Sequence, residues 1–237
     1  MNLEIDCISI NGVNLYSFTS FDEIIAFAEE KKGILVAMNA GKIGHSTPEM
    51  QDIINNNIGY ADGMAAVWAL KKKGAKNAVK LPGCELWLKI IEKKYKDSSF
   101  YIVGGKQEVI ENTIHKLKQE FDGINIVGYR NGYLKTDEEI DALENDIVSK
   151  RPSVVFMAMG SPKQELLMKR FSHKHHAIYQ GLGGSLDVYT GKVERAPEFI
   201  IRWKLEGPYR VLQDSKKWKR FVFDLGVVIK IKLGIMK

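Results

Sequence analysis

The stretch Ser153-Val-Val-Phe-Met-Ala-Met-Gly-Ser-Pro-Lys-Gln-Glu165 changes from an unbroken apolar run into a polar turn and then into the start of a helix. An apolar run without alternation is typical of a strand that is covered on both faces of a parallel sheet. Ligands of open parallel sheets bind beyond the carboxyl ends of the strands. The polar turn therefore offers Gly160, Lys163 and Gln164 as candidate ligand contacts, although Lys163 and Glu165 also fit a solvated helix turn.

The same pattern recurs along the chain. Ala177-Ile-Tyr-Gln180 runs into Gly181-Leu-Gly-Gly-Ser-Leu-Asp187, and other short apolar runs alternate with helical segments. These runs are residues 34–38, 100–103 and 124–127. Alternating strands and helices form a parallel sheet with helices on both faces. The sequence predicts a Rossmann-like α/β domain over residues 1–195 with a mainly parallel sheet.

Local signals add detail at the amino-terminal end. Asn11-Gly12 between two short runs predicts a small hairpin, because Asn-Gly is the preferred two-residue hairpin turn. Ser20 and Thr136 are each followed three residues later by glutamate, the capping-box pattern that begins a helix. After the strand that ends at Asn39, we expect a polar turn and then a helix from about Thr47.

Two glycine turns are candidate phosphate contacts. Gly104-Gly105-Lys106 lies between a strand and a helix start, where backbone N–H groups and the helix dipole attract anions. It lacks the spacing of a P-loop or of a dinucleotide fingerprint, which disfavours kinases and dehydrogenases. Gly181, Gly183 and Gly184 form the second turn, and glycines in tight turns are as often purely conformational.

Asp62 is a candidate general base. It stands between Ala61 and Gly63 at a strand-to-helix turn, where a carboxylate can accept a proton from a substrate hydroxyl. The alternative is a helix N-cap, a role that aspartate often fills. The histidines have no metal-ligand spacing, and neither an Asp-x-Asp nor a GxSxG motif occurs, so metal-assisted and acyl-enzyme mechanisms are disfavoured. We expect no metal and no cofactor.

The carboxyl-terminal residues 196–237 differ in composition from the domain before them. From Arg202 onward, ten lysines and arginines face three acidic residues, among large apolar side chains such as Trp218. The apolar run is too short for the roughly 20 residues of a membrane-spanning helix. A basic amphipathic helix on a membrane surface is favoured over a last helix packed on the domain with a solvated basic face. An apolar tail also leaves a homo-oligomer open.

Two features favour the cytoplasm. The cysteines, Cys7 and Cys84, make no disulfide framework, and the amino terminus has no basic region typical of a signal peptide. We expect a cytoplasmic protein that is peripheral on the inner face of the cell membrane. A net charge of +6 favours an anionic partner, but no RNA or DNA motif is present, and no nucleic-acid partner is expected.

A series of blocks together resembles the WecG/TagA/CpsF family of bacterial glycosyltransferases. The resemblance covers nearly the whole chain, and its most specific parts are Tyr60-Ala-Asp-Gly63 and Gly160-Ser-Pro-Lys-Gln-Glu165. The further blocks are Met38-Asn-Ala40, Lys80-Leu-Pro-Gly83, Val103-Gly-Gly-Lys106, Gly181-Leu-Gly-Gly-Ser-Leu-Asp187, Arg195-Ala-Pro197 and Tyr209-Arg-Val-Leu-Gln213.

The resemblance implies a metal-independent, inverting transfer of a sugar from a UDP-sugar to a lipid-linked acceptor. The sugar would be glucose, galactose, N-acetylmannosamine or its uronate. The acceptor would be N-acetylglucosaminyl-diphospho-undecaprenol, and the product would enter O-antigen, capsule, common-antigen or teichoic-acid synthesis. The alternatives are a non-catalytic module that binds a nucleotide sugar or polyanion, and a nucleic-acid-binding protein that uses the basic tail.

The resemblance also implies roles for single residues. Asp62 matches the family's proposed base, and Asn39 and Gln164 match polar residues near the reacting sugars. The remaining implied substrate contacts lie in the glycine turns, in cations and in the basic tail. They are Lys80, Gly104, Gly105, Lys106, Gly160, Lys163, Gly181, Gly183, Gly184, Asp187, Arg195, Arg202, Arg210 and Arg220.

This chain departs from the family pattern at several positions, including Leu205-Glu-Gly-Pro208, where relatives have an aromatic-rich segment. Ala37 stands where relatives commonly have threonine, Lys80 where they have arginine, and Glu85 where they have aspartate. Lysine meets a diphosphate as a point charge but lacks the bidentate fork of arginine. These changes bear on the donor sugar and its phosphate contacts more than on the class of reaction.

Overall fold

The computed structural model describes residues 5–194, 197, 200, 209 and 218–236. Its centre is a six-stranded sheet in the order β4-β3-β8-β7-β5-β6, in which every neighbouring pair is parallel. The strands are β3 (Gly33–Met38), β4 (Ile58–Ala61), β5 (Ser99–Gly104), β6 (Asn125–Arg130), β7 (Val154–Ala158) and β8 (Ile178–Gly181). The predicted α/β class with a parallel sheet is confirmed.

The unbroken apolar runs mark the strands at the centre of the sheet. Every residue of β7 and of β8 is buried, because helices cover both faces there. On one face Phe156 stacks on Phe100 and meets the edge of Trp87. Side chains of a central parallel strand are enclosed whichever way they point, so such a strand has no polar alternation.

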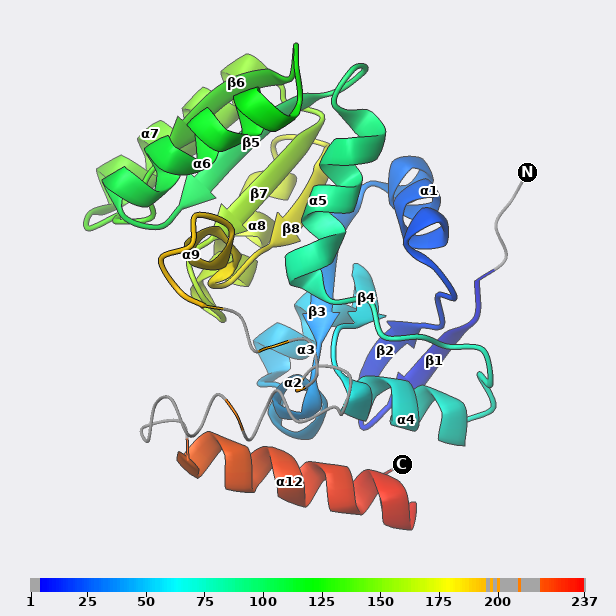
Figure 1. Cartoon of the computed structure of the whole chain (residues 1–237). Helices are drawn as coiled ribbons and strands as arrows, with labels where there is room; N and C mark the ends of the chain where they lie inside the picture. Colours follow the sequence, from blue (N-terminus) through cyan, green and yellow to red (C-terminus); the bar gives the residue numbers. More distant parts are fainter. Residues whose placement is uncertain (1–4, 195–196, 198–199, 201–208, 210–217, 237) are drawn as a thin grey trace.

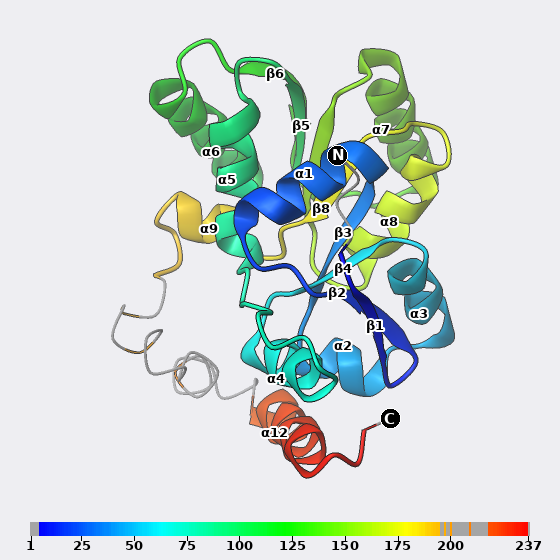
Figure 2. The same ribbon diagram turned by 90° about the vertical axis from the view of Figure 1, so that its right-hand side faces the viewer.

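Helices form a layer on each side of the sheet (Figures 1 and 2). One layer contains α1 (Phe21–Lys31), α5 (Gly83–Lys94), α6 (Gln107–Glu120) and α9 (Ser185–Tyr189). The other contains α3 (Pro48–Asn55), α7 (Asp137–Lys150) and α8 (Lys163–Ser172). The helix starts follow the sequence signals: the Ser20 hydroxyl accepts from the Glu23 N–H at 3.1 Å, and Thr136 forms a complete capping box.

The amino-terminal hairpin is also confirmed. It pairs β1 (Cys7–Ile10) with β2 (Val13–Tyr16) in antiparallel register around the Asn11-Gly12 turn. The hairpin packs beside β4 and α4 (Met64–Lys72). One expectation was wrong: the segment after Asn39 is not only a turn but contains a short helix, α2 (Ala40–His45). The Asn39 side chain caps it, and Ala40 and Ile43 are buried, which holds six residues helical despite two glycines.

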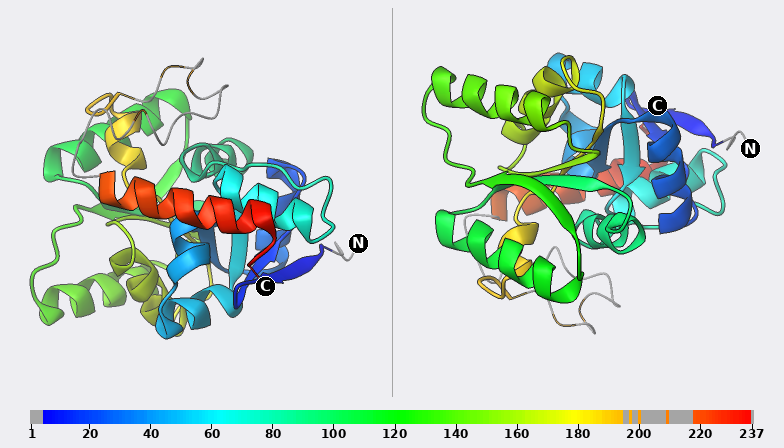
Figure 3. Two further views of the ribbon diagram at one scale, coloured as in Figure 1. Left: turned by 90° about the horizontal axis from the view of Figure 1, so that it is seen from below. Right: turned by 90° about the horizontal axis from the view of Figure 1, so that it is seen from above.

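The last helix, α12 (Trp218–Leu233), lies across the carboxyl-end side of the sheet, over α2 and α4 (Figure 3). Val227 and Ile231 are buried in this contact, and Gly44 of α2 makes room for it, since a Cβ there would overlap the Val227 side chain. The outward residues Val222, Leu225 and Ile229 are nearly half exposed. The helix therefore packs on the domain and is apolar on its outer side as well. In the described ranges, no helix has the length and apolar character needed to cross a membrane.

Buried tyrosines make the free energy of unfolding depend on pH in the alkaline range. The hydroxyl of fully buried Tyr179 donates to the His175 carbonyl at 3.1 Å, and burial raises the pKa of this phenol above its usual value of 10.0. Above that pH the unfolded chain releases the proton while the folded chain keeps it, so the free energy of unfolding falls as pH rises. We expect Tyr179→Phe to flatten this fall, measured by denaturant unfolding on both sides of pH 10. Parallel pH curves for the variant and wild type would contradict the expectation.

Candidate active site

Polar residues from several strand ends gather at the carboxyl edge of the sheet, as parallel strands require. Asn39 follows β3, Asp62 follows β4, Gln164 opens α8 after β7, and Gly183 follows β8. The first two are adjacent, since a Cβ on Gly63 would lie 3.7 Å from the Cβ of Asn39. The structure thus brings the predicted residues of β4, β3, β8 and β7 to one edge.

The Asp62 carboxylate has a fixed orientation. The backbone N–H groups of Asp62 and Gly63 both donate to the Met38 carbonyl, at 3.1 and 3.3 Å, which ties the end of β4 to β3. Oδ1 of Asp62 accepts from the Gly83 N–H at 2.6 Å. The N-cap alternative is thus partly realised, but on a different helix: the cap of α4 is Gly63, whereas Asp62 binds the first turn of α5. A carboxylate is favourable at that end of the helix dipole.

Gly83 is the point where three polar side chains meet. A Cβ there would lie 2.8 Å from the Tyr60 hydroxyl, 3.4 Å from Asp62 Oδ1 and 3.8 Å from Gln180 Nε2. Gln180, which is fully buried, donates from Nε2 to the Gly83 carbonyl at 3.1 Å. Burial, and secondly the charge of Asp62, hold the pKa of Tyr60 well above its ordinary value. The missing side chain at Gly83 therefore permits the arrangement that positions Asp62.

Gln164 joins the turns after β7 and β8. It is buried, and its Oε1 accepts from the Gly183 N–H at 3.0 Å. A Cβ on Gly181 would overlap the Gln164 amide, so this glycine is needed for close approach. Gln164 therefore shapes the glycine turn directly, whatever else it contacts. Gly183 itself has a positive φ of 56°, a conformation that favours glycine.

A buried ion pair that the sequence did not indicate lies beside Gln164. Lys42 Nζ of α2 contacts Glu165 Oε1 of α8 at 2.7 Å and donates to the Ala37 carbonyl at 3.1 Å. The two side chains are 13% and 3% exposed. The interpretation of Glu165 as part of a solvated helix turn was wrong, because the side chain points into the protein. Lys163 does lie on the surface, where its Nζ donates to the Leu134 carbonyl at 3.3 Å.

The glycine turn after β5 is built by packing. Gly104 has a φ of 145°, and a Cβ on it would overlap Ala158 of the neighbouring strand. The N–H of Gly105 donates to the Ala158 carbonyl at 3.3 Å, so it is already engaged. Lys106 is exposed at the start of α6. Because β5 lies four strands from β4, this turn is about 19 Å from the end of β4 at a strand spacing of about 4.8 Å.

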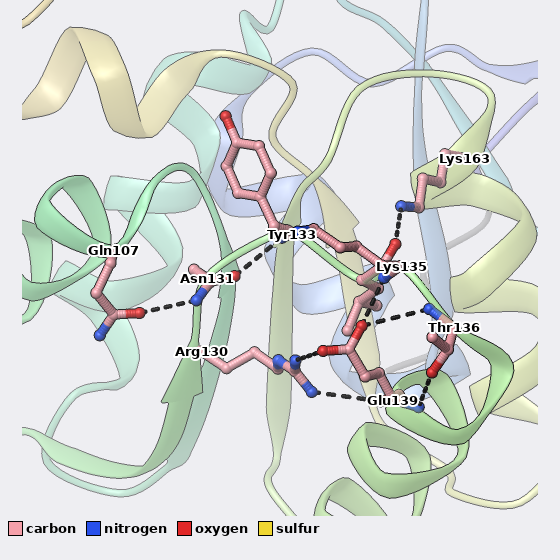
Figure 4. Close-up of polar contacts among 9 residues, drawn as sticks. Gln107, Arg130, Asn131, Tyr133, Lys135, Thr136, Glu139 and Lys163 are labelled. Carbon is pink, nitrogen blue, oxygen red and sulfur yellow. Dashed lines mark hydrogen bonds and ion pairs between the residues drawn. The ribbon is translucent and has the colours of Figure 1, made fainter.

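The loop between β6 and α7 adds an exposed aromatic ring to this edge (Figure 4). The Gly132 N–H donates to the Gly105 carbonyl at 3.0 Å, so the loop rests on the turn after β5. Oδ1 of Asn131 accepts a hydrogen bond from the Tyr133 N–H at 3.0 Å, and Nδ2 of Asn131 donates to Gln107 Oε1 at 2.8 Å. The ring of Tyr133 is 56% exposed and points away from these contacts. Tyr133 is not among the residues predicted from the sequence, although Asn131-Gly132 at a strand end followed by an aromatic residue was a usable signal.

The remaining predicted contacts divide into two groups. Gly160 and Gly184 are exposed in the turns after β7 and β8, Lys80 is half-buried in the loop before α5, and Asp187 is half-buried in the short helix α9. Arg195, Arg202 and Arg210 lie outside the described residues, and of Arg220 only its place in α12 is described. In the described part of the chain, no three His, Cys, Asp or Glu side chains gather as they would to hold a metal ion.

We expect Glu165→Ala to destabilise the protein by about 3–5 kcal/mol, because it leaves the Lys42 ammonium buried without its counter-charge. Glu165→Gln also removes the counter-charge but keeps an amide oxygen that accepts from Lys42, so it should cost less than Glu165→Ala. Urea unfolding of both variants measures the two losses. A loss below about 1 kcal/mol for Glu165→Ala, the value of an exposed pair, would show that the ion pair is not what holds α2 to α8.

Comparison with known protein families agrees with this layout. Residues 5–233 match the model of the glycosyl transferase WecG/TagA/CpsF family, which is nearly the whole chain and includes every turn described above. Members transfer a sugar from a donor to an acceptor, so the carboxyl edge with Asp62 and Gln164 is the candidate place for that transfer. The chain belongs to the WecG/TagA/CpsF family of glycosyl transferases.

Proposed function

We propose that the protein is an inverting glycosyltransferase that uses a UDP-sugar and acts on a lipid-linked acceptor. The sugar is a hexose or N-acetylhexosamine, and the acceptor is N-acetylglucosaminyl-diphospho-undecaprenol of a surface-polysaccharide pathway. The observation that carries the proposal is the fixed Asp62 carboxylate at the strand edge of a glycosyl transferase chain. A base with one oxygen held by the Gly83 N–H is already oriented for proton transfer.

The reaction follows from that placement. The acceptor hydroxyl oxygen bonds to the anomeric carbon while the bond from that carbon to the UDP oxygen breaks, and the hydroxyl proton passes to Asp62. Attack from the face opposite UDP inverts the anomeric centre. Asn39, beside Asp62, is placed to orient the acceptor or the donor sugar through its amide. Charge on the leaving diphosphate is met by cations and backbone N–H groups.

We assign the parts of the donor to different turns from the spacing of the strand ends along the sheet edge. The turns after β7 and β8 lie between Asp62 and the turn after β5. Gly160, Gly183 and Gly184 leave open space where a side chain would stand, so the diphosphate can approach their backbone. Lys106, four strands away from β4, is then placed to meet the nucleoside end and not the anomeric carbon.

The nucleoside end of the donor meets the β6–α7 loop in this arrangement. The half-exposed ring of Tyr133 is held on a pinned loop above Gly105, and an aromatic face of this kind stacks on a nucleobase. Lys163 and Lys106 flank the same region from the turns after β7 and β5. We infer that Tyr133 stacks on the uracil of the donor.

The membrane surface is the proposed second partner. The outer residues of α12 include Trp218, Val222, Leu225, Ile229 and Leu233, spaced at helical intervals and 46–67% exposed. Such a stripe, bordered by lysines, fits the boundary between headgroups and acyl chains. Residues 196–237 would then form an appendage that keeps the enzyme on the inner face of the cell membrane. Its arginines Arg202, Arg210 and Arg220 are proposed to close over the diphosphate, and Arg195, just before the appendage, is proposed as a further substrate contact. A homo-oligomer through the same stripe is the competing use of this surface.

We expect Asp62→Asn to lower turnover by about 10²–10⁴-fold, because the amide cannot accept the acceptor proton. The amide oxygen still accepts from the Gly83 N–H, so the fold and the affinity for the UDP-sugar should change little. The measurement is UDP release with a short-chain N-acetylglucosaminyl-diphosphate lipid, together with donor binding by calorimetry. Near-normal turnover of this variant would show that Asp62 is not the base. If wild type releases no UDP with any donor, the protein is better explained as a binding module.

Tyr133→Ala should raise the dissociation constant of UDP by about 5- to 100-fold, the loss expected for one stacked base. Tyr133→Phe keeps the ring and should bind nearly as wild type. Tyr129→Ala, at a tyrosine that is 46% exposed on β6, is the matched control. If Tyr133→Ala binds UDP as tightly as the Tyr129 control, the base stacks elsewhere.

A further inference from the structure

A second basic surface lies on the domain itself, beside the carboxyl-terminal end of α12. It consists of Lys71, Lys72, Lys73 and Lys76 at the end of α4, and of Lys230 and Lys232 on α12. All six are exposed. The two helices are in direct contact here: Lys72 Nζ donates to the Lys232 carbonyl at 2.5 Å, and Lys232 Nζ lies 4.8 Å from the ring centre of Trp68 on α4. We call these six residues the α4–α12 lysine patch.

The patch lysines form no ion pairs within the described residues, which distinguishes them from most described lysines elsewhere on the protein. No aspartate or glutamate occurs in residues 63–84 or in residues 225–236, the two segments that carry the patch. Lysines on the other helices are commonly paired, as Lys93 is with Asp22 and Lys169 with Asp52. Within the described residues, none of the six patch lysines forms an ion pair with a carboxylate. The six charges are therefore not neutralised by carboxylates of the described residues, although Lys72 donates to a carbonyl and Lys232 lies over the Trp68 ring.

Apolar groups stand at the same end of the molecule. Leu233 and Ile235 are 67% and 64% exposed beside the patch. A pocket of about 230 Å³ opens between the hairpin, α4 and the end of α12. Its walls include the apolar residues Ile10, Ala69, Ile231 and Met236 together with Lys72 and Lys73. Cations beside exposed apolar side chains match a surface that is anionic at its boundary and apolar beneath.

We propose that the α4–α12 lysine patch binds the anionic headgroups of a phospholipid bilayer. The inference rests on the proposed membrane placement of α12 and adds a second contact, made by the globular domain. The dipole of a helix also favours lysines in its last turn, which accounts for Lys71, Lys72, Lys230 and Lys232 but not for Lys76, which lies beyond the end of α4. Two contacts, one apolar and one electrostatic, fix both the depth and the rotation of the domain on the membrane.

The test compares vesicles that contain phosphatidylglycerol with vesicles of phosphatidylcholine alone, using co-sedimentation of the full chain. The triple variant Lys71→Ala, Lys73→Ala, Lys76→Ala removes three patch lysines and leaves α12 unchanged. Each lysine near an anionic surface contributes about fivefold, so partitioning onto the anionic vesicles should fall on the order of 100-fold. Binding to neutral vesicles, which depends on α12, should be retained, and added salt should weaken only the anionic component.

The matched control removes the same charge elsewhere. Lys89→Ala, Lys96→Ala, Lys118→Ala changes exposed lysines on or next to α5 and α6, away from α12 (Figure 1). An equal loss of binding in this control, or no loss in the patch variant, would overturn the proposal. So would selective displacement of the protein from vesicles by glycerol phosphate at matched ionic strength, which would indicate a site for free phosphate. If wild type binds neither kind of vesicle, the proposed placement of α12 on a membrane is wrong as well. Circular dichroism of each variant confirms that it is folded.

Discussion

The ion pair between Lys42 and Glu165 is the contact on which the edge of the sheet depends. It joins α2, which follows β3, to α8, which follows β7, across the end of β8 that lies between them. A few backbone hydrogen bonds join the turns at the strand ends, and side chains connect the helices that follow them. Gln164 extends the same connection by accepting from the Gly183 N–H beyond β8. These side chains thereby connect three separate turns.

Glycines allow these turns to approach each other. Gly181 admits the Gln164 amide, Gly83 admits the hydroxyl of Tyr60 beside Asp62, and Gly104 lets β5 meet Ala158 of β7. The last contact engages backbone groups that a phosphate would otherwise use. A glycine-rich turn at a helix start is therefore not sufficient to identify a phosphate site, and its neighbours decide what the glycine is for. The open turns at Gly160, Gly183 and Gly184 have the free space that the turn after β5 lacks.

The carboxyl-terminal helix has one side buried against the domain and an apolar side that is exposed. Val227 and Ile231 bury one side of α12 against α2 and α4, and the opposite side remains apolar and exposed. The α2 helix that receives it begins at Asn39, beside Asp62. The last helix thus packs on the short helix α2, and α2 starts next to the residue proposed as the base. The surface proposed to lie on a membrane and the site proposed for a lipid-linked acceptor are therefore separated by a single element.

The sequence by itself determined the architecture and most of the edge. Short unbroken apolar runs that end in polar or glycine turns favour central strands, and capping residues such as Thr136 act locally, so both can be predicted without coordinates. The hairpin turn and the placement of Asp62 at a strand end belong to the same local class. Only the tertiary structure decided the partners of those residues. Lys42 and Glu165 are separated by 123 positions, and the Asp62 carboxylate binds α5 and not its own helix. Such contacts arise from the order of strands in the sheet, which depends on the packing of the whole chain and leaves no periodic trace in any one segment.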